Sequence, residues 1–178
     1  MDKEELFNVY LTSGERADIA ATMEKITNNQ LIFRIANVWI MNPRGQILLA
    51  KNNKRNHKNF SQWNASVTGR ITANDTPLSG ALREAKEELG LDLAPVDLRL
   101  LETQLYNKPA TAAPVYVDIW LANVPDMDAS EFVLQDSEVA AVEWHDLANV
   151  KNWRESGISI GSETFDRRLR PLLDWLGQ

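Results

Sequence analysis

Three observations predict an α/β fold for this chain of 178 residues. Much of the sequence consists of short apolar runs bounded by Gly, Pro, Asn and Asp, which is the pattern of β-strands. A segment with clear helix start and stop signals interrupts these runs between residues 75 and 90, and an amphipathic segment lies near the end of the chain. No repeat, low-complexity tract or interdomain linker is visible. We therefore expect residues 1–178 to form a single domain.

The strands are predicted from the turns that separate them. Residues 6–10 and 16–20 flank Thr12-Ser13-Gly14-Glu15 and form a plausible hairpin. Asn42-Pro43-Arg44-Gly45 is a strong turn signal between two apolar runs, and Pro109 and Pro114 bound a later loop. The further strands expected are 31–41, 46–50, 63–68, 98–107, 115–123 and 139–144.

The central helix has identifiable ends. Asp75 or Thr76 can cap its N-terminus, Pro77 lies in the first turn, and Gly90 supplies the stop. An apolar stripe should pack on the core, so the opposite, acidic face should point into a cleft or into water. The residues of this stripe are Ala81, Leu82, Ala85 and Leu89. Residues 145–153 and 164–176 are also expected to be helical.

Composition narrows the class of protein. The net charge of −6 and a pI near 5.0 argue against a general binder of nucleic acid or of anionic membranes. The absence of cysteine excludes disulfides, cysteine-based zinc sites and thiol nucleophiles. The segment MDKEELFNVY lacks the apolar centre of a signal peptide, and no apolar run approaches membrane-spanning length. We expect a cytoplasmic enzyme.

The central helix carries three carboxylates at helical spacing. Glu84, Glu87 and Glu88 stand at i, i+3 and i+4, so they should share a face and repel one another. A cation would relieve this repulsion, and oxygen ligands suit a hard ion such as Mg²⁺ or Mn²⁺. The alternative is a solvated acidic face that Lys86 compensates in part.

The surrounding spacing resembles the signature of the Nudix hydrolases. Gly69, Asp75 and the run from Arg83 to Leu91 follow the family pattern Gly-x5-Glu-x7-Arg-Glu-U-x-Glu-Glu-x-Gly-U, where U is apolar. Only Asp75 departs from it, because the family usually has glutamate there. The resemblance covers residues 31–175 and implies an α/β/α sandwich around a mixed sheet, preceded by the hairpin extension within residues 1–30.

The same resemblance implies a metal site and a reaction. Glu84, Glu87 and Glu88, with the backbone carbonyl of Gly69, would bind Mg²⁺ or Mn²⁺, and water would split a P–O–P linkage. Arg83 would orient a helix glutamate, or form only a structural salt bridge. Glu138 is a candidate metal ligand or general base, and the candidate catalytic residues are therefore Arg83, Glu84, Glu87 and Glu138.

A branch of the family can also be considered. The hairpin and the run Trp63 to Gly69 are similar to the isopentenyl-diphosphate isomerases, which carry a catalytic cysteine just before this glycine and a histidine just after it. Here these positions are Thr68 and Arg70. We therefore expect the architecture of that branch without its reaction. Isomerase activity and a non-catalytic, ligand-binding Nudix domain remain as alternatives to the hydrolase.

Residues 69–91, which carry this signature, are called the box below, and substrate contacts outside the box are less clearly marked. Lys51, Arg55 and Lys58 belong to a cationic loop, with Lys54 and His57, that could hold phosphates or could simply be solvated. One of Trp39, Trp63 and Trp120 could stack on a base, although burial in the core is the more common role. The expected partner is a small-molecule diphosphate, with no nucleic acid or membrane, and the chain could form a homodimer.

Overall fold

The computed structural model describes residues 4–53, 61–107, 112–160 and 164–177. Its main sheet has the strand order β5-β4-β3-β8-β7, with β6 paired to β3 and β9 paired to β4. The β3–β8 pair is parallel and the other pairs are antiparallel, so the sheet is mixed. These strands are β3 (Phe33–Met41), β4 (Gln46–Asn52), β5 (Trp63–Asn64), β6 (Val67–Arg70), β7 (Leu98–Tyr106), β8 (Val115–Asn123) and β9 (Val139–Asp146).

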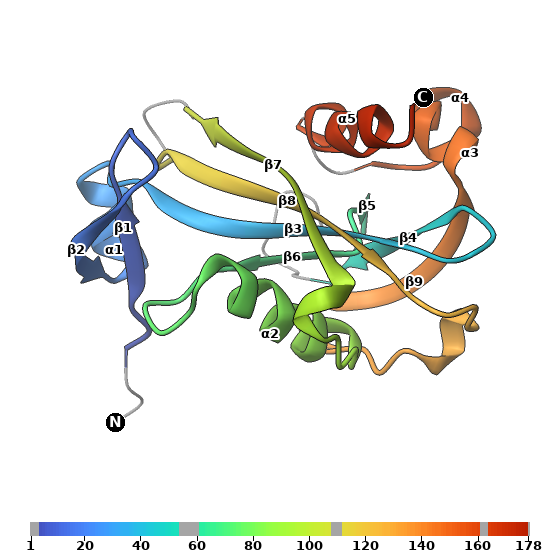
Figure 1. The fold of residues 1–178 in the computed structure, drawn as a ribbon, viewed down its shortest axis with the longest axis horizontal. Coiled ribbons are helices and arrows are strands. Elements are labelled where there is room, and N and C mark those ends of the chain that lie inside the picture. Colours follow the sequence, from blue (N-terminus) through green and yellow to red (C-terminus); the bar gives the residue numbers. More distant parts are fainter. Residues whose placement is uncertain (1–3, 54–60, 108–111, 161–163, 178) are drawn as a thin grey trace.

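Helices cover both faces of this sheet, as Figure 1 shows: α2 (Pro77–Leu89) lies on one side and α5 (Phe165–Trp175) on the other. Alternate residues of β3 enter two different hydrophobic cores because successive side chains of a strand point to opposite faces. Trp39 packs with residues of α5, whereas Val38 and Ile40 pack with residues of α2. The predicted α/β/α sandwich around a mixed sheet is confirmed. The shorter helices are α1 (Met23–Asn28), α3 (Leu147–Lys151), α4 (Trp153–Ser156), η1 (Pro95–Asp97) and η2 (Ala129–Glu131).

The predicted N-terminal hairpin is also present. Strands β1 (Phe7–Tyr10) and β2 (Arg16–Ala21) form a separate two-stranded antiparallel sheet. The Tyr10 amide donates to the Ile32 carbonyl at 2.9 Å, and the Ala73 amide donates to the Leu6 carbonyl at 2.7 Å. The hairpin is thereby tied both to the start of the main sheet and to the turn that precedes α2.

The predicted strand 63–68 is wrong as a single strand. Its first residues pair with β4 as β5, and its last residues pair with β3 as β6. Between them Ser66 is fully buried, and its hydroxyl accepts from the Ile40 amide and donates to the Leu48 carbonyl. A buried side chain thus replaces ladder hydrogen bonds at the point where the segment changes partners.

The predicted helix 145–153 is also wrong at its start. His145 and Asp146 are the last residues of β9, where they pair with Ile47 and Gln46 of β4. The hydrogen bonds of this ladder override the local helical pattern, so α3 begins only at Leu147. The helix predicted over 164–176 is confirmed as α5, whereas α1, which buries only Ile26, was not predicted.

The end of α2 allows a stability prediction. Gly90 caps the helix with a φ of 68°, and a Cβ there would lie 2.7 Å from the Cβ of Val133. Gly90→Ala should therefore cost more than the roughly 1–2 kcal/mol of a left-handed residue alone. Gly157→Ala is the matched control, because Gly157 has a φ of 78° but no neighbour within 4 Å of a Cβ. Equal losses of thermal stability in the two variants would contradict the role of Val133.

Among the described residues, no helix combines the length and apolar character needed to cross a membrane.

Candidate metal and catalytic site

The structure shows which of the two candidate residues, Asp75 or Thr76, caps the N-terminus of α2. Thr76 is the N-cap: its hydroxyl accepts from the Ser79 amide at 3.1 Å, and the Ser79 hydroxyl accepts from the Thr76 amide at 2.8 Å. Pro77 occupies the first turn. Because Thr76 caps the helix, Asp75 is left to make other contacts.

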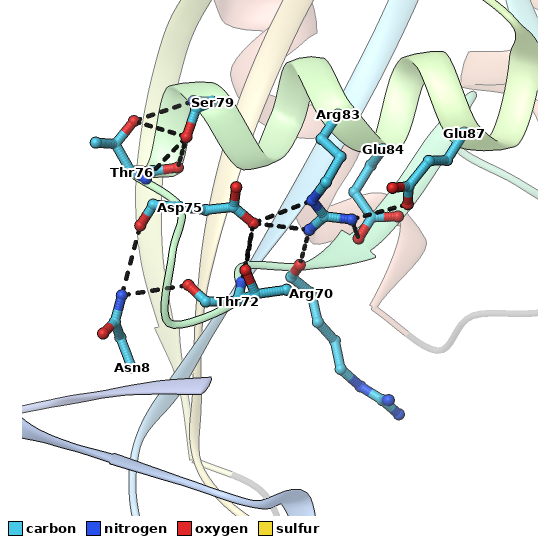
Figure 2. Close-up of polar contacts among 9 residues, drawn as sticks. All are labelled: Asn8, Arg70, Thr72, Asp75, Thr76, Ser79, Arg83, Glu84 and Glu87. Atoms are coloured by element: carbon cyan, nitrogen blue, oxygen red, sulfur yellow. Dashed lines mark hydrogen bonds and ion pairs between the residues drawn. The ribbon is translucent and has the colours of Figure 1, made fainter. Parts of the chain in front are cut away.

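Asp75 holds the guanidinium of Arg83 (Figure 2). Its Oδ2 accepts from Arg83 Nε at 3.1 Å and Nη2 at 2.9 Å, and also from the amide and hydroxyl of Thr72. Burial alone would raise the pKa of Asp75, but the hydrogen bonds from Arg83 and Thr72 and the charge of Arg83 lower it. The shorter carboxylate at the one unusual position of the box therefore still reaches the arginine.

Arg83 connects this anchor to the acidic part of the helix. Its Nη1 lies 3.0 Å from Oε1 of Glu84 and 2.8 Å from Oε2 of Glu87, and its Nη2 donates to the Arg70 carbonyl. In Figure 2 the guanidinium lies between Asp75 on one side and the two glutamates on the other. Arg83 thus makes a structural salt bridge and orients two box glutamates at once.

The three box glutamates do not all face outward, contrary to the sequence prediction. Glu84 is 9% exposed and Glu88 is 5% exposed, whereas Glu87 is exposed. The two buried carboxylates turn toward β6, where the Thr68 amide donates to Glu88 Oε2 at 3.4 Å. Glu84 can turn inward because Gly69 of β6 has no side chain.

Gly69 makes that room. A Cβ at position 69 would lie 1.8 Å from Cδ of Glu84, a separation that no substituted residue could adopt. The backbone of Gly69 and the carboxylate of Glu84 are therefore in direct contact. This brings together two of the groups that the box resemblance assigns to metal binding.

The pKa of Glu84 is shifted by burial and by the charges of neighbouring residues. Burial raises the pKa of Glu84, Arg83 opposes this effect, and the charges of Glu87 and Glu138 add to it. Glu138, which is distant in sequence, thus acts on the same carboxylate as its helix neighbour Glu87. Candidate residues from two separate segments of the chain therefore influence one carboxylate.

Backbone hydrogen bonds bring Glu138 to the box helix. The Gln135 amide donates to the Glu88 carbonyl at 3.0 Å, and the Glu138 amide donates to the Gln135 carbonyl at 2.8 Å. The Asn53 amide donates to the Glu138 carbonyl, also at 2.8 Å. The segment before β9 is therefore fixed to both α2 and the end of β4.

The donor chemistry of this site fits a divalent ion. Carboxylate oxygens and a backbone carbonyl are the ligands that Mg²⁺ and Mn²⁺ prefer. Within the described part of the chain no three acidic, His or Cys side chains already stand in a coordinating arrangement. Arg83 instead occupies one oxygen each of Glu84 and Glu87, so it partly neutralises the cluster as a cation would.

A second polar contact lies on the other face of the sheet. Asn37 Nδ2 donates to the hydroxyl of Thr68 at 2.9 Å, and its Oδ1 is buried without a hydrogen-bond partner in the structure. Asn37 is 0% exposed. Sequence reasoning missed this residue, although an asparagine in the middle of the apolar run FRIANVWIM was a detectable signal.

The structure describes only some of the remaining predicted substrate contacts. The ammonium of Lys51 lies 5.7 Å from the ring centroid of Trp63, whereas Arg55 and Lys58, with Lys54 and His57, fall outside the described residues. Trp39 and Trp120 are buried in the two cores, as their more common role suggested, while Trp63 is half-buried. Trp63 is thus the member of this set that retains exposed surface.

Comparisons with known proteins match most of this chain. Residues 32–165 match the model of the NUDIX domain. An uncharacterized Nudix hydrolase of Listeria innocua is 30% identical over 135 residues, which are 75% of this chain and 75% of that protein. Nudix hydrolase 3 of Arabidopsis thaliana is 29% identical over 157 residues, 84% of this chain, but the chain spans only 20% of that protein's length.

A solved structure supports the same fold. The structure of DR0079 from Deinococcus radiodurans superposes with a TM-score of 0.67 and covers 93% of this chain and 98% of its own. Its sequence is 16% identical, so this likeness concerns the fold alone.

Proposed function

This chain belongs to the Nudix hydrolase family, and from that membership we propose that it hydrolyses a diphosphate linkage with the help of Mg²⁺ or Mn²⁺. The observation that carries the proposal is that the buried carboxylate of Glu84 lies against Gly69 and is acted on by the charges of Glu87 and Glu138. Arg83 neutralises only part of this acidic cluster. A divalent ion would neutralise more of it and would activate water for attack on a diphosphate.

We assign the metal-binding role to the carboxylates of Glu84, Glu87 and Glu88 and to the carbonyl of Gly69. A divalent ion held there would neutralise phosphate charge and make water a better nucleophile. The carboxylate of Glu138 is our candidate to take the proton from the attacking water, because it approaches Glu84 from a different segment. Arg83 is a positioning residue: it fixes Glu84 and Glu87 from the Asp75 side.

We further propose a nucleoside diphosphate linked to a second group, or a similar small diphosphate, as substrate. Lys51 and the half-buried Trp63 beside it could contact such a substrate, as could Arg55 and Lys58. We propose that residues 1–178 form a single domain, because the N-terminal hairpin bonds directly to the turn before α2. We also propose that the protein is cytoplasmic. We also propose that the chain can form a homodimer.

We also propose that the chain shares the architecture, and not the reaction, of the isopentenyl-diphosphate isomerases. Thr68 occupies the position of their cysteine and hydrogen-bonds to Asn37. A threonine hydroxyl is far too weak an acid to replace a thiol in proton transfer to a double bond. Incubation with isopentenyl diphosphate and Mg²⁺ should therefore yield no dimethylallyl isomer, and its appearance at an enzymatic rate would contradict this proposal.

The proposed hydrolysis is tested by a substrate panel. Nucleoside diphosphates, nucleotide sugars, dinucleotides and prenyl diphosphates would be incubated with the protein and Mg²⁺ or Mn²⁺, with EDTA as the control. We expect release of inorganic phosphate or a nucleoside monophosphate from at least one of them. No release from any compound, by protein that still binds Mn²⁺, would favour a domain that binds ligand without catalysis.

A further inference from the structure

The N-terminal hairpin lies against the turn that leads into the box helix. Phe7 of β1 forms an isolated antiparallel bridge with Thr72. The next residue, Asn8, is 5% exposed. The hairpin therefore places a buried amide side chain beside residues 72–75, directly before the N-cap of α2.

The side chain of Asn8 binds both ends of this turn. Its Nδ2 donates to the Thr72 carbonyl at 3.3 Å and to the Asp75 carbonyl at 3.4 Å, as Figure 2 shows. The Asp75 amide donates to the Thr72 carbonyl at 3.1 Å, which closes the turn. Because both partners of Asn8 are carbonyl oxygens, they need a donor with two N–H groups. The contact thus depends on the amide at position 8.

The carboxylate of Asp75 is fixed inside the same turn. Its Oδ2 accepts from the Thr72 amide at 3.2 Å and from the Thr72 hydroxyl at 2.8 Å. The same oxygen accepts from two nitrogens of Arg83. Aspartate is one methylene shorter than the glutamate of the Nudix pattern, so its carboxylate reaches less far from the backbone. The position of the turn therefore decides whether this carboxylate meets the guanidinium.

Arg83 extends these contacts to the box carboxylates. Its Nη1 binds Glu84 and Glu87. The hairpin also lies near a second partner of Arg83: the guanidinium carbon of Arg70 is 5.8 Å from the ring centroid of Phe7, and the Arg70 carbonyl accepts from Arg83 Nη2. A continuous series of contacts therefore leads from β1 through the turn to two of the proposed metal ligands.

We propose that Asn8 is a positioning residue, which fixes the turn 72–75 from the hairpin and thereby sets the places of Asp75, Arg83 and the box glutamates. The first part, the placement of Arg83, holds or fails without any metal. The second part, an effect on metal binding, rests on the proposed function. The hairpin would then contribute to the site that α2 carries.

The first test follows the Nε–H proton of Arg83 by NMR in EDTA. This proton is donated to Asp75, so it should exchange slowly with water in the wild type. Asn8→Ala should speed the exchange by about threefold or more, the effect of a weak hydrogen bond on an opening equilibrium. Arg83→Lys, which lacks this proton, identifies the signal. Asn8→Ser keeps one donor and should give an intermediate rate, and it provides the same test if Asn8→Ala does not fold.

Asn42→Ala is the matched control for lost stability. Asn42 is 3% exposed, and its side chain also holds a turn, because it accepts from the Arg44 and Gln46 amides. This turn joins β3 to β4 at the end of the molecule opposite the hairpin (Figure 1). Asn42→Ala should lower the Tm but leave the exchange at Arg83 unchanged. An unchanged rate in Asn8→Ala, or equal acceleration in both variants, would refute the positioning role.

The second test is a double-mutant cycle on Mn²⁺ affinity. Asp75→Ala should weaken binding by about tenfold or more, as is usual when a partner of metal ligands is lost, and Asn8→Ala by a smaller factor. In the Asp75→Ala background, Asn8→Ala should still lower the Tm, since its backbone partners remain, but should not weaken Mn²⁺ binding further. Additive effects on affinity would contradict the second part of the proposal. A wild type that binds no Mn²⁺ would refute the proposed function, while the exchange test still decides the first part.

Discussion

Glutamine in place of Glu84 or Glu88 is expected to lower divalent-ion-dependent hydrolysis by about 100-fold or more. A metal ion contributes several kcal/mol of transition-state charge stabilisation, and each ~1.4 kcal/mol is a factor of ten in rate. Both carboxylates are buried beside β6, Glu84 against Gly69 and Glu88 below the Thr68 amide. Steady-state kinetics on the best compound of the substrate panel measures the effect.

The folded state should survive these substitutions. Glutamine has nearly the same volume, and its carbonyl oxygen can still accept from the Thr68 amide. Burial raises the pKa of Glu84 despite the opposing effect of Arg83, so the neutral side chain is favoured in the folded state. The Glu84 variant loses the ion pair with Arg83 but also the burial cost and the repulsion from Glu87 and Glu138, so its stability without metal should equal or exceed that of the wild type. Lys86→Gln is the control, since Lys86 lies on the same helix and, among the described residues, pairs only with the exposed Asp92. Retention of full activity in both glutamate variants would exclude the proposed site.

Removal of Asp118 is expected to destabilise the protein by about 3–5 kcal/mol, the usual cost of leaving one partner of a buried ion pair. Its Oδ2 lies 3.1 Å from Nε of Arg34, with side-chain exposures of 2% and 14%. Burial raises the pKa of Asp118, although Thr103 and Arg34 oppose this effect. The guanidinium of Arg34 also lies over the rings of Tyr10 and Tyr116, so it could not readily turn into water.

Chemical denaturation of Asp118→Ala measures this loss. The double variant Arg34→Met with Asp118→Leu removes both charges and should recover most of the stability, because apolar replacements of a buried pair are often neutral or better. A loss below about 1 kcal/mol in the single variant would mean that this pair behaves like a solvent-exposed one.

Much of the fold could be predicted because its signals are local. The turn at residues 42–45, the proline near the start of α2 and Gly90 at its end each act within a few residues. The strand pairings of residues 63–70 and 145–146 are not local. They depend on β3 and β4, whose ladders decide where β5, β6 and β9 begin and end.

In the candidate site, too, local features could be predicted from the sequence and tertiary contacts could not. The spacing of the box predicted which residues would be near one another, but not that Arg83 would bridge Asp75 to Glu84 and Glu87. The inward turn of Glu84 depends on the space at Gly69 of β6, and that of Glu88 on the Thr68 amide. Helical periodicity does not contain these tertiary contacts.

The central claim is that the carboxylates around Gly69 bind a divalent ion. Mn²⁺ titrated into the wild type and followed by electron paramagnetic resonance counts free and bound ions without any substrate. We expect Glu84→Gln and Glu88→Gln each to weaken binding by about tenfold or more, and Lys86→Gln to leave it unchanged. Equal Mn²⁺ affinity in the wild type and both glutamate variants would contradict the assignment of the metal site to this helix.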